Sequence, residues 1–258
     1  MINRKAFIVG VKSTSLSKRE IFFLKKYKPW GIILFSRNVK GFDQIKKLIK
    51  DIRFIFKDKN YPILIDQEGG RVNRLNNLIE TSVLTAEFFG NLYKNNKKKF
   101  FNYYKVYINQ ISYLLNEIGV NINTVPVLDV RRIKSSNVIG DRSYSSSAKN
   151  VSKIGDVCIE EFKKRRIGTI IKHIPGHGLA KVDSHKFTPV IKKKMKYLYK
   201  NDFAAFKNKK TFFAMTAHVI YEDIDPINTA THSKKIIKLI RKKIGFKNII
   251  ISDDISMK

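Results

Sequence analysis

Short apolar runs rich in β-branched residues alternate with longer amphipathic stretches along this chain, and this alternation restricts its fold more than any other property. Such a pattern is typical of βα units, in which parallel strands form a sheet covered by helices. Seven candidate strands are residues 6–11, 31–35, 63–65, 120–122, 168–171, 211–215 and 248–251. Helices are expected near residues 17–27, 42–56, 98–117, 148–163, 196–207 and 233–244. The pattern predicts an α/β fold with a parallel sheet.

Polar side chains follow most of the candidate strands at the point where each strand should end. They include Ser36, Arg37 and Asn38, Asp66, Lys172 and His173, Thr216 and His218, and Ser252 with Asp253. In a (β/α)8 TIM barrel the site is made at the carboxyl ends of the strands. A doubly wound open sheet also binds ligands there, but the turn at residues 10–14 lacks its glycine-rich phosphate fingerprint. The pattern therefore favours a barrel with one site.

Length and composition are consistent with one domain over residues 1–258, because 43% hydrophobic content can form a sizeable core. The single Cys158 excludes an intrachain disulfide and is expected to be a buried structural thiol. This fits a reducing, cytoplasmic setting. The segment before Lys12 has too few apolar residues for a secretory signal, and no later stretch is long enough to span a membrane.

The formal net charge of +31 raises the question of a polyanionic partner, because clustered Lys and Arg neutralise phosphates. The lysines are spread along the chain, with runs at residues 97–99 and 192–194, and no nucleic-acid-binding motif accompanies them. We interpret the charge as a solvated basic surface and expect neither a nucleic-acid nor a membrane partner.

The five histidines lie close together in the sequence, at His173, His177, His185, His218 and His232, which first suggests a metal centre. Pro175 and Gly176 break any helix between His173 and His177, so these two cannot project as a zinc-binding pair. We therefore expect no metal site. In contrast, Asp183 precedes His185 by two residues and can orient its imidazole for acid/base chemistry near neutral pH.

Several motifs occur in order over nearly the whole chain. They are Gly31-Ile-Ile-Leu-Phe-Ser-Arg-Asn38, Asp66-Gln-Glu-Gly-Gly-Arg71-Val-Asn-Arg74, Pro126-Val-Leu-Asp129, Ile139-Gly-Asp-Arg142-Ser-Tyr, Lys172-His173-Ile-Pro-Gly-His177-Gly, Asp183-Ser-His185, Met215-Thr-Ala-His218 and Ser252-Asp253-Asp254-Ile-Ser-Met. Together they resemble bacterial β-N-acetylhexosaminidases of glycoside hydrolase family 3. The resemblance implies a TIM barrel that removes terminal N-acetylglucosamine from muropeptides in peptidoglycan recycling, without a cofactor.

The resemblance also implies a role for individual residues. Asp253 matches the family's nucleophile, His185 its acid/base and Asp183 the partner of that histidine. The sugar-binding positions are matched by Asp66, Arg74, Arg142, Lys172 and His173. The implied reaction retains configuration through a covalent glycosyl-enzyme, on a muropeptide or a small chitooligosaccharide-like substrate, and we expect a monomer.

Two alternatives accompany this interpretation. The adjacent acids Asp253 and Asp254 are also typical of substrate-assisted hexosaminidases, in which the sugar's acetamido group is the nucleophile and Asp254 would be the acid. In addition, only a few residues follow the seventh strand, so we expect a barrel truncated after that strand and C-terminally incomplete. A catalytically impaired remnant that binds sugars or polyanions is the alternative function.

Overall fold

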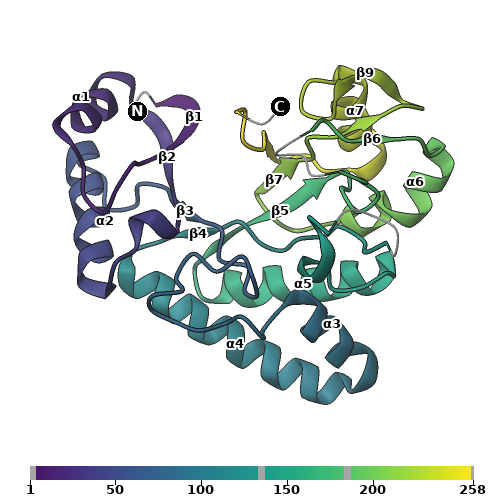
Figure 1. Cartoon of the computed structure of the whole chain (residues 1–258), viewed down its shortest axis with the longest axis horizontal. Coiled ribbons are helices and arrows are strands. Elements are labelled where there is room, and N and C mark those ends of the chain that lie inside the picture. The colour runs from purple at the N-terminus through teal and green to yellow at the C-terminus, as the bar shows by residue number, and fades with distance from the viewer. Residues whose placement is uncertain (1–3, 133–136, 183–186, 257–258) are drawn as a thin grey trace.

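The computed structural model describes residues 4–132, 137–182 and 187–256. Its main sheet has seven strands, all parallel, in the order β1-β2-β3-β4-β5-β7-β10 (Figure 1). These strands are β1 (Lys5–Gly10), β2 (Pro29–Leu34), β3 (Ile63–Ile65), β4 (Ile122–Asn123), β5 (Gly168–Ile174), β7 (Phe213–Thr216) and β10 (Ile249–Ile251). Each predicted apolar run overlaps one of them, the fourth at Ile122 alone, so the predicted α/β class and parallel sheet are confirmed.

The six predicted helices are also present. They are α1 (Lys18–Tyr27), α2 (Phe42–Phe56), α4 (Lys97–Ile118), α5 (Ala148–Lys164), α6 (Met195–Asn201) and α7 (Lys234–Leu239). The first begins with a capping box, in which Ser17 Oγ accepts from the Glu20 N–H and the Glu20 carboxylate accepts from the Ser17 N–H. The last two are shorter than predicted, because the chain continues as a 3-10 turn at Phe203–Phe206 and a π turn at Ile240–Ile244.

Some elements were not predicted from the sequence. Helix α3 (Ala86–Asn95) precedes α4, and Asn96 separates the two by capping the second, accepting a hydrogen bond from the Lys99 N–H. A small second sheet consists of β6 (Val190–Ile191), β8 (Ile220–Tyr221) and β9 (Asp225–Thr229). Strands β6 and β8 have two residues each, too few to show a hydrophobic period. Strand β9 has five residues, but its three central residues are exposed and its buried ends are Asp225 and Thr229, so it shows no apolar pattern either.

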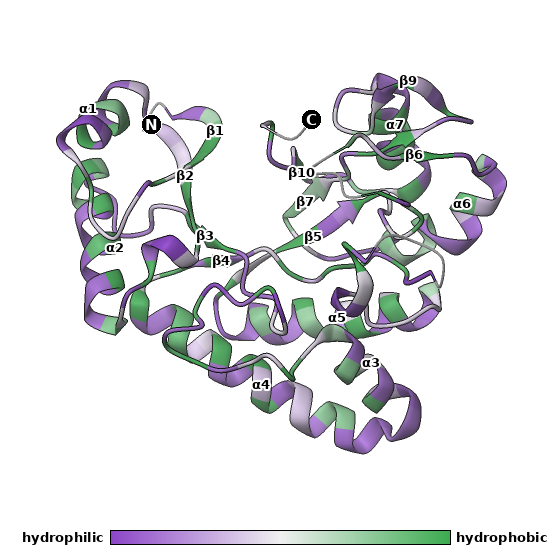
Figure 2. Ribbon diagram, in the orientation of Figure 1, coloured by the Kyte–Doolittle hydropathy of each residue, from purple (hydrophilic) through white to green (hydrophobic). Residues whose placement is uncertain are grey.

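The main sheet curls into a half-barrel. Trp30 of β2 packs on Phe213 of β7 with 5.4 Å between ring centroids, although three strands separate β2 from β7 in the sheet. In a flat sheet, four strand spacings would place the two backbones roughly 19 Å apart. Leu64, Ile122, Ile170 and Met215 form the apolar core of the concave side. A larger core lies between the sheet and the helices, whose residues alternate between hydrophobic and hydrophilic along α4 and α5 (Figure 2).

Helix α3 holds the loop that carries Arg142. A Cβ added at Gly90 would lie 1.6 Å from the carbonyl oxygen of Tyr144, so helix and loop touch backbone to backbone. The Tyr144 hydroxyl shares a 2.7 Å hydrogen bond with the Tyr104 hydroxyl on α4. Together these contacts fix the chain just after Arg142.

Two further predictions from the sequence are a buried, unpaired Cys158 and the absence of a membrane-spanning helix. Cys158 is buried and free, as predicted, and burial raises the pKa of its thiol to about 12 despite hydrogen bonds from Tyr104 and Tyr144. This thiol is therefore protonated at neutral pH. In the described part of the chain, no helix has the length and apolar character needed to cross a membrane.

Replacement of Gly90 by alanine should destabilise the protein, because the added methyl group has to displace the Tyr144 backbone. We expect Gly90→Ala to lower the free energy of unfolding by about 1–3 kcal/mol in urea denaturation. Gly41→Ala is the control, since nothing lies within 4 Å of a Cβ built at Gly41, and it should cost less than about 1 kcal/mol. Equal stabilities of the two variants would contradict the close approach.

Candidate active site

Polar side chains converge at the carboxyl ends of three strands. Asp66 follows β3 directly, Lys172 and His173 lie near the end of β5, and Asp253 lies two residues after β10. Because the curled sheet brings these strand ends together, residues distant in sequence come into contact. The structure brings Lys172 to Asp66 and His173 to Asp253.

Lys172 is the centre of a buried polar network. Its ammonium group donates hydrogen bonds to Asp66 Oδ1 at 3.0 Å and to Thr124 Oγ1 at 2.9 Å, and it lies 2.6 Å from Glu68 Oε1. The Thr124 hydroxyl in turn donates to Asp66. Since only 3% of the Lys172 side chain is exposed, all three ammonium hydrogens are used within the protein.

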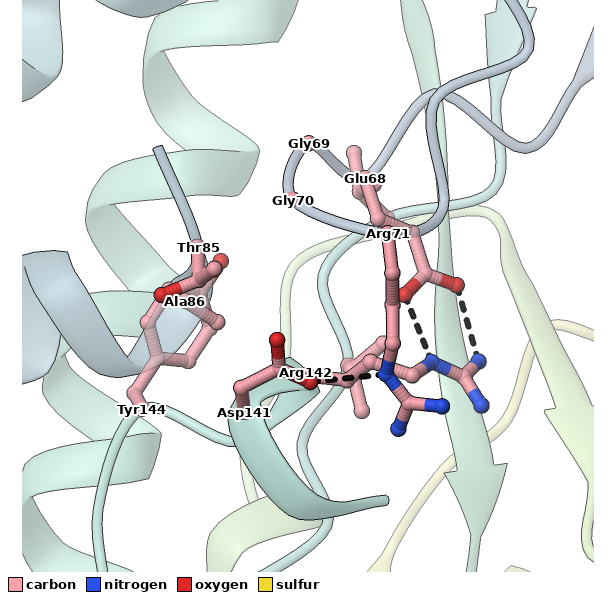
Figure 3. A pocket seen from close by; sticks show the side chains of 11 residues that line it. Glu68, Gly69, Gly70, Arg71, Thr85, Ala86, Asp141, Arg142 and Tyr144 are labelled. Carbon is pink, nitrogen blue, oxygen red and sulfur yellow. Dashed lines mark hydrogen bonds and ion pairs between the residues drawn. The ribbon is translucent and has the colours of Figure 1, made fainter. Parts of the chain in front are cut away.

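Two arginines complete the network. Arg142 donates to Glu68 from Nε at 2.8 Å and from Nη2 at 2.9 Å, a bidentate pair seen in Figure 3. Arg74 Nη2 lies 3.5 Å from Asp66 Oδ2. Both predicted arginines are therefore part of the same cluster as Asp66 and Lys172.

The network keeps its carboxylates ionised. Burial alone would raise the pKa of Glu68, but Arg142 and Lys172 hold it well below its ordinary value. Burial also acts to raise the pKa of Asp66, and Lys172, Thr124 and Arg74 together lower it overall. Burial conversely acts to lower the pKa of Lys172, which the two carboxylates raise. At neutral pH these groups are charged, and each carboxylate lies beside groups of opposite charge.

A second chain of contacts runs from Asp129 to Asp253. Asp129 is fully buried, and its Oδ2 lies 2.6 Å from His173 Nδ1. Burial would raise the pKa of Asp129, but His173 and the His177 backbone N–H lower it, so the group is a carboxylate. The ionised Asp129 accepts a hydrogen bond from the Nδ1–H group of His173. The other ring nitrogen of His173, Nε2, lies 4.0 Å from Asp253 Oδ2.

Asp129 also holds the turn that leads to His177. Its Oδ1 accepts a 2.6 Å hydrogen bond from the His177 backbone N–H. The His177 ring is buried, and its Nδ1 makes no hydrogen bond within the described residues. Burial, with the nearby His173, lowers the pKa of His177 to about 4. His177 is therefore neutral at pH 7.

The two adjacent acids at the end of β10 differ in their surroundings. Asp253 is 22% exposed and faces His173, and its Oδ1 accepts from the Asp254 N–H at 2.9 Å. Asp254 is directed to the following turn, where its Oδ1 accepts from the Ser256 N–H and hydroxyl at 2.9 and 2.7 Å. Asp253 is thus the acid of the two whose carboxylate lies near His173.

Three residues of these networks were not predicted from the sequence. Glu68, Thr124 and Asp129 were not singled out as site residues, although Glu68 and Asp129 lie within motifs that carry the family resemblance. Asp129 follows an apolar run, which is the signal that identified the other strand-end residues. The predicted acid/base pair, His185 and Asp183, lies outside the described residues.

A crevice lies beside the Glu68–Arg142 pair (Figure 3). It is lined by Glu68, Gly69, Gly70, Arg71, Thr85, Ala86, Val125, Val127, Asp141, Arg142 and Tyr144. Arg71 Nε lies 2.8 Å from Asp141 Oδ1. The crevice is thus lined by two ion pairs, Arg71–Asp141 and Arg142–Glu68. No group of three or more His, Cys, Asp or Glu that could hold a metal occurs among the residues the structure describes.

Ionised groups at the carboxyl ends of a curled parallel sheet are the arrangement in which enzymes of the barrel class build their active sites. Residues 7–258 match the family model described as glycosyl hydrolase family 3 N terminal domain. The chain belongs to glycosyl hydrolase family 3, which confirms the resemblance seen in its motifs.

Relatives of known name or structure agree with this membership. The chain is 31% identical over 261 residues to the beta-hexosaminidase of Haemophilus ducreyi, covering 97% of this chain and 72% of the relative. It is similar to the crystal structure of NagZ from Neisseria gonorrhoeae, with a TM-score of 0.87, 28% identity and coverage of 100% of this chain and 75% of that one. The structure of a glycoside hydrolase family 3 β-N-acetylglucosaminidase from a Paenibacillus species is also similar, with a TM-score of 0.84 and 27% identity. That match covers 97% of this chain and 48% of the Paenibacillus chain.

Acid should destabilise the protein partly through His177. Its folded pKa of about 4 lies below the unfolded value of about 6.5, so the unfolded state gains a proton first as pH falls through this window. The cost between pH 6.5 and 4 is roughly 3 kcal/mol. Urea unfolding at pH 7 and pH 4.5 should show a smaller loss for His177→Gln than for the wild type.

The exposed His232 provides the control for this experiment. His232→Gln should lose as much stability between the two pH values as the wild type. The lowered pKa values of Asp66 and Glu68 also favour unfolding in acid, but all three proteins share that contribution. An unchanged loss in His177→Gln would show that His177 is not held neutral by burial.

Proposed function

We propose that this chain is a β-N-acetylhexosaminidase that removes terminal non-reducing β-linked N-acetylglucosamine from muropeptides in cytoplasmic peptidoglycan recycling. The observation that carries the proposal is the Asp253 carboxylate at the end of β10, facing His173 beside the charged network around Lys172. The name of the Haemophilus relative supports the reaction class. A structure of the Neisseria protein in complex with N-trifluoroacetyl-D-glucosamine supports the type of sugar.

The proposed reaction is a double displacement. Asp253 attacks the anomeric carbon and forms a covalent glycosyl-enzyme, while His185, paired with Asp183, protonates the leaving oxygen. Water, deprotonated by the same histidine, then releases the sugar with retained configuration. Asp253 fits the nucleophile's role because it is partly exposed and lies at a strand end next to buried, ionised groups.

The charged network fits the recognition of a neutral sugar. Asp66 can accept hydrogen bonds from sugar hydroxyls, and Arg74 and Arg142 can donate to hydroxyl or amide oxygens. Lys172 and Thr124 hold Asp66 in place, and Asp129 orients His173. Such preorganisation places the sugar ring for attack.

We further propose that the half-barrel contributes seven strands of a (β/α)8 barrel, in one domain over residues 1–258 that acts as a monomer without a cofactor. The alternative of a catalytically impaired, polyanion-binding remnant is not favoured, because the curated relatives matched over most of their length are named as enzymes.

Removal of the Asp253 carboxylate should abolish hydrolysis. With 4-nitrophenyl N-acetyl-β-glucosaminide as substrate, we expect Asp253→Ala to lower kcat/KM by at least about a thousandfold. Asp254→Ala is the matched control and should retain activity within about tenfold, since Asp254 caps the following turn. A larger loss in Asp254→Ala would contradict the assignment and favour the substrate-assisted reaction, in which Asp254 is the acid.

A slow fluorinated substrate should separate direct attack from substrate assistance. Direct attack leaves a glycosyl group covalently bound to the protein, which intact mass spectrometry detects and peptide mapping should locate at Asp253. In the substrate-assisted reaction the sugar's own acetamido group is the nucleophile, so no protein adduct accumulates. Turnover of this substrate without any adduct would therefore favour the acetamido route.

A further inference from the structure

Glu68 is the shared counterion of Arg142, which we propose to donate to the sugar, and of Lys172, which holds Asp66 in place. Its carboxylate accepts the bidentate hydrogen bonds of Arg142 at 2.8 and 2.9 Å and lies 2.6 Å from Lys172 Nζ. Only 6% of its side chain is exposed. The three residues come from the loop after β3, the turn at Gly140–Arg142 and strand β5, so the contact joins distant parts of the chain.

The donor count of Arg142 shows why this contact matters. Of its five N–H groups, two donate to Glu68 and one donates to the Val138 carbonyl at 3.2 Å. A guanidinium held by a bidentate carboxylate has a fixed plane, so the direction of its remaining N–H groups is fixed as well. Glu68 thus determines where Arg142 can donate.

We propose that Glu68 is a positioning residue for sugar binding, acting through Arg142 and Lys172. This inference rests on the proposed function, because it requires the site to bind an N-acetylated sugar. Glu68 does not need to touch the sugar itself.

The charge balance of the cluster supports the proposal. Asp66 and Glu68 are the two carboxylates that pair with its three cations, Arg74, Arg142 and Lys172. Without Glu68 the three cations share Asp66 alone. Arg142 then loses its bidentate partner, and the buried Lys172 loses one of its three acceptors. Both side chains should leave their positions.

Binding of N-trifluoroacetyl-D-glucosamine to the full chain, followed by fluorine NMR titration, tests this proposal without requiring turnover. We expect Glu68→Gln to raise the dissociation constant by about 10- to 100-fold, the effect of losing hydrogen bonds between charged groups. Glu161→Gln is the matched control, because Glu161 is also buried (8% exposed side chain) and paired with a lysine, Lys164, at 2.8 Å. It should bind the sugar within about twofold of the wild type.

The outcomes separate the inference from the proposed function. If the wild type fails to bind the sugar, both are wrong. If the wild type binds and folded Glu68→Gln binds equally well, only the role of Glu68 is wrong. A loss of affinity in Glu68→Gln but not in Glu161→Gln supports the inference and rules out a general effect of removing a buried carboxylate.

Two further variants keep the test decisive if Glu68→Gln does not fold. Glu68→Asp keeps the charge but shortens the reach to Arg142, so its affinity should fall at least about fivefold. Wild-type affinity in folded Glu68→Asp would overturn the proposal. In an Arg142→Gln background, the effect of Glu68→Gln on affinity should be several-fold smaller than in the wild type, because only the contribution through Lys172 remains and coupled residues are not additive. A full additional loss there would show that Glu68 does not act through Arg142.

Discussion

Packing on the concave side of the main sheet is the interaction on which the site depends. The contact between Trp30 and Phe213 spans three intervening strands and requires the sheet to curl. This curvature turns the carboxyl ends of β3, β5 and β10 towards a common centre. Asp66, Lys172 and Asp253 would otherwise lie along an extended edge, too far apart to form one polar site. The apolar core thus sets the geometry of a polar site.

The buried charges are stable only as a set. Moving a lysine or a carboxylate out of water is costly, and the cost is offset only when partners satisfy the group. Lys172 has three partners, and Glu68 has two. Asp129 is satisfied by the His173 ring and by the His177 backbone. Each group therefore depends on the folded positions of several others, and the network rigidifies the floor of the site.

Local sequence patterns predicted the framework well. The seven strands and six helices follow from hydrophobic periodicity, which is a property of neighbouring residues. The residues after Ile65, Ile171 and Ile251 could be assigned to one site, because parallel strands end at the same side of a sheet. The exact ends of α6 and α7 were missed because short 3-10 and π turns continue a helical pattern.

Partners from distant parts of the chain could not be predicted in the same way. Glu68 pairs with Arg142, which lies 74 residues later in the sequence, and Asp129 contacts His173, which lies 44 residues later. Nothing in the local pattern states which carboxylate pairs with which cation, because that choice is made by tertiary packing. Helix α3 was hidden for a related reason, since the polar Asn96 that separates it from α4 is a helix cap.

The contact between Gly90 and the Tyr144 backbone has a meaning for sequence variation. Because it joins a helix to a loop without any intervening side chain, it does not depend on which side chains surround it. Position 90 therefore strongly favours glycine, because the side chain of any larger residue would have to displace the backbone of the loop that carries Arg142. Helix α3 packs beside the turn at Gly140–Arg142, so the absence of a side chain at one helical position helps to set where an arginine on another segment lies.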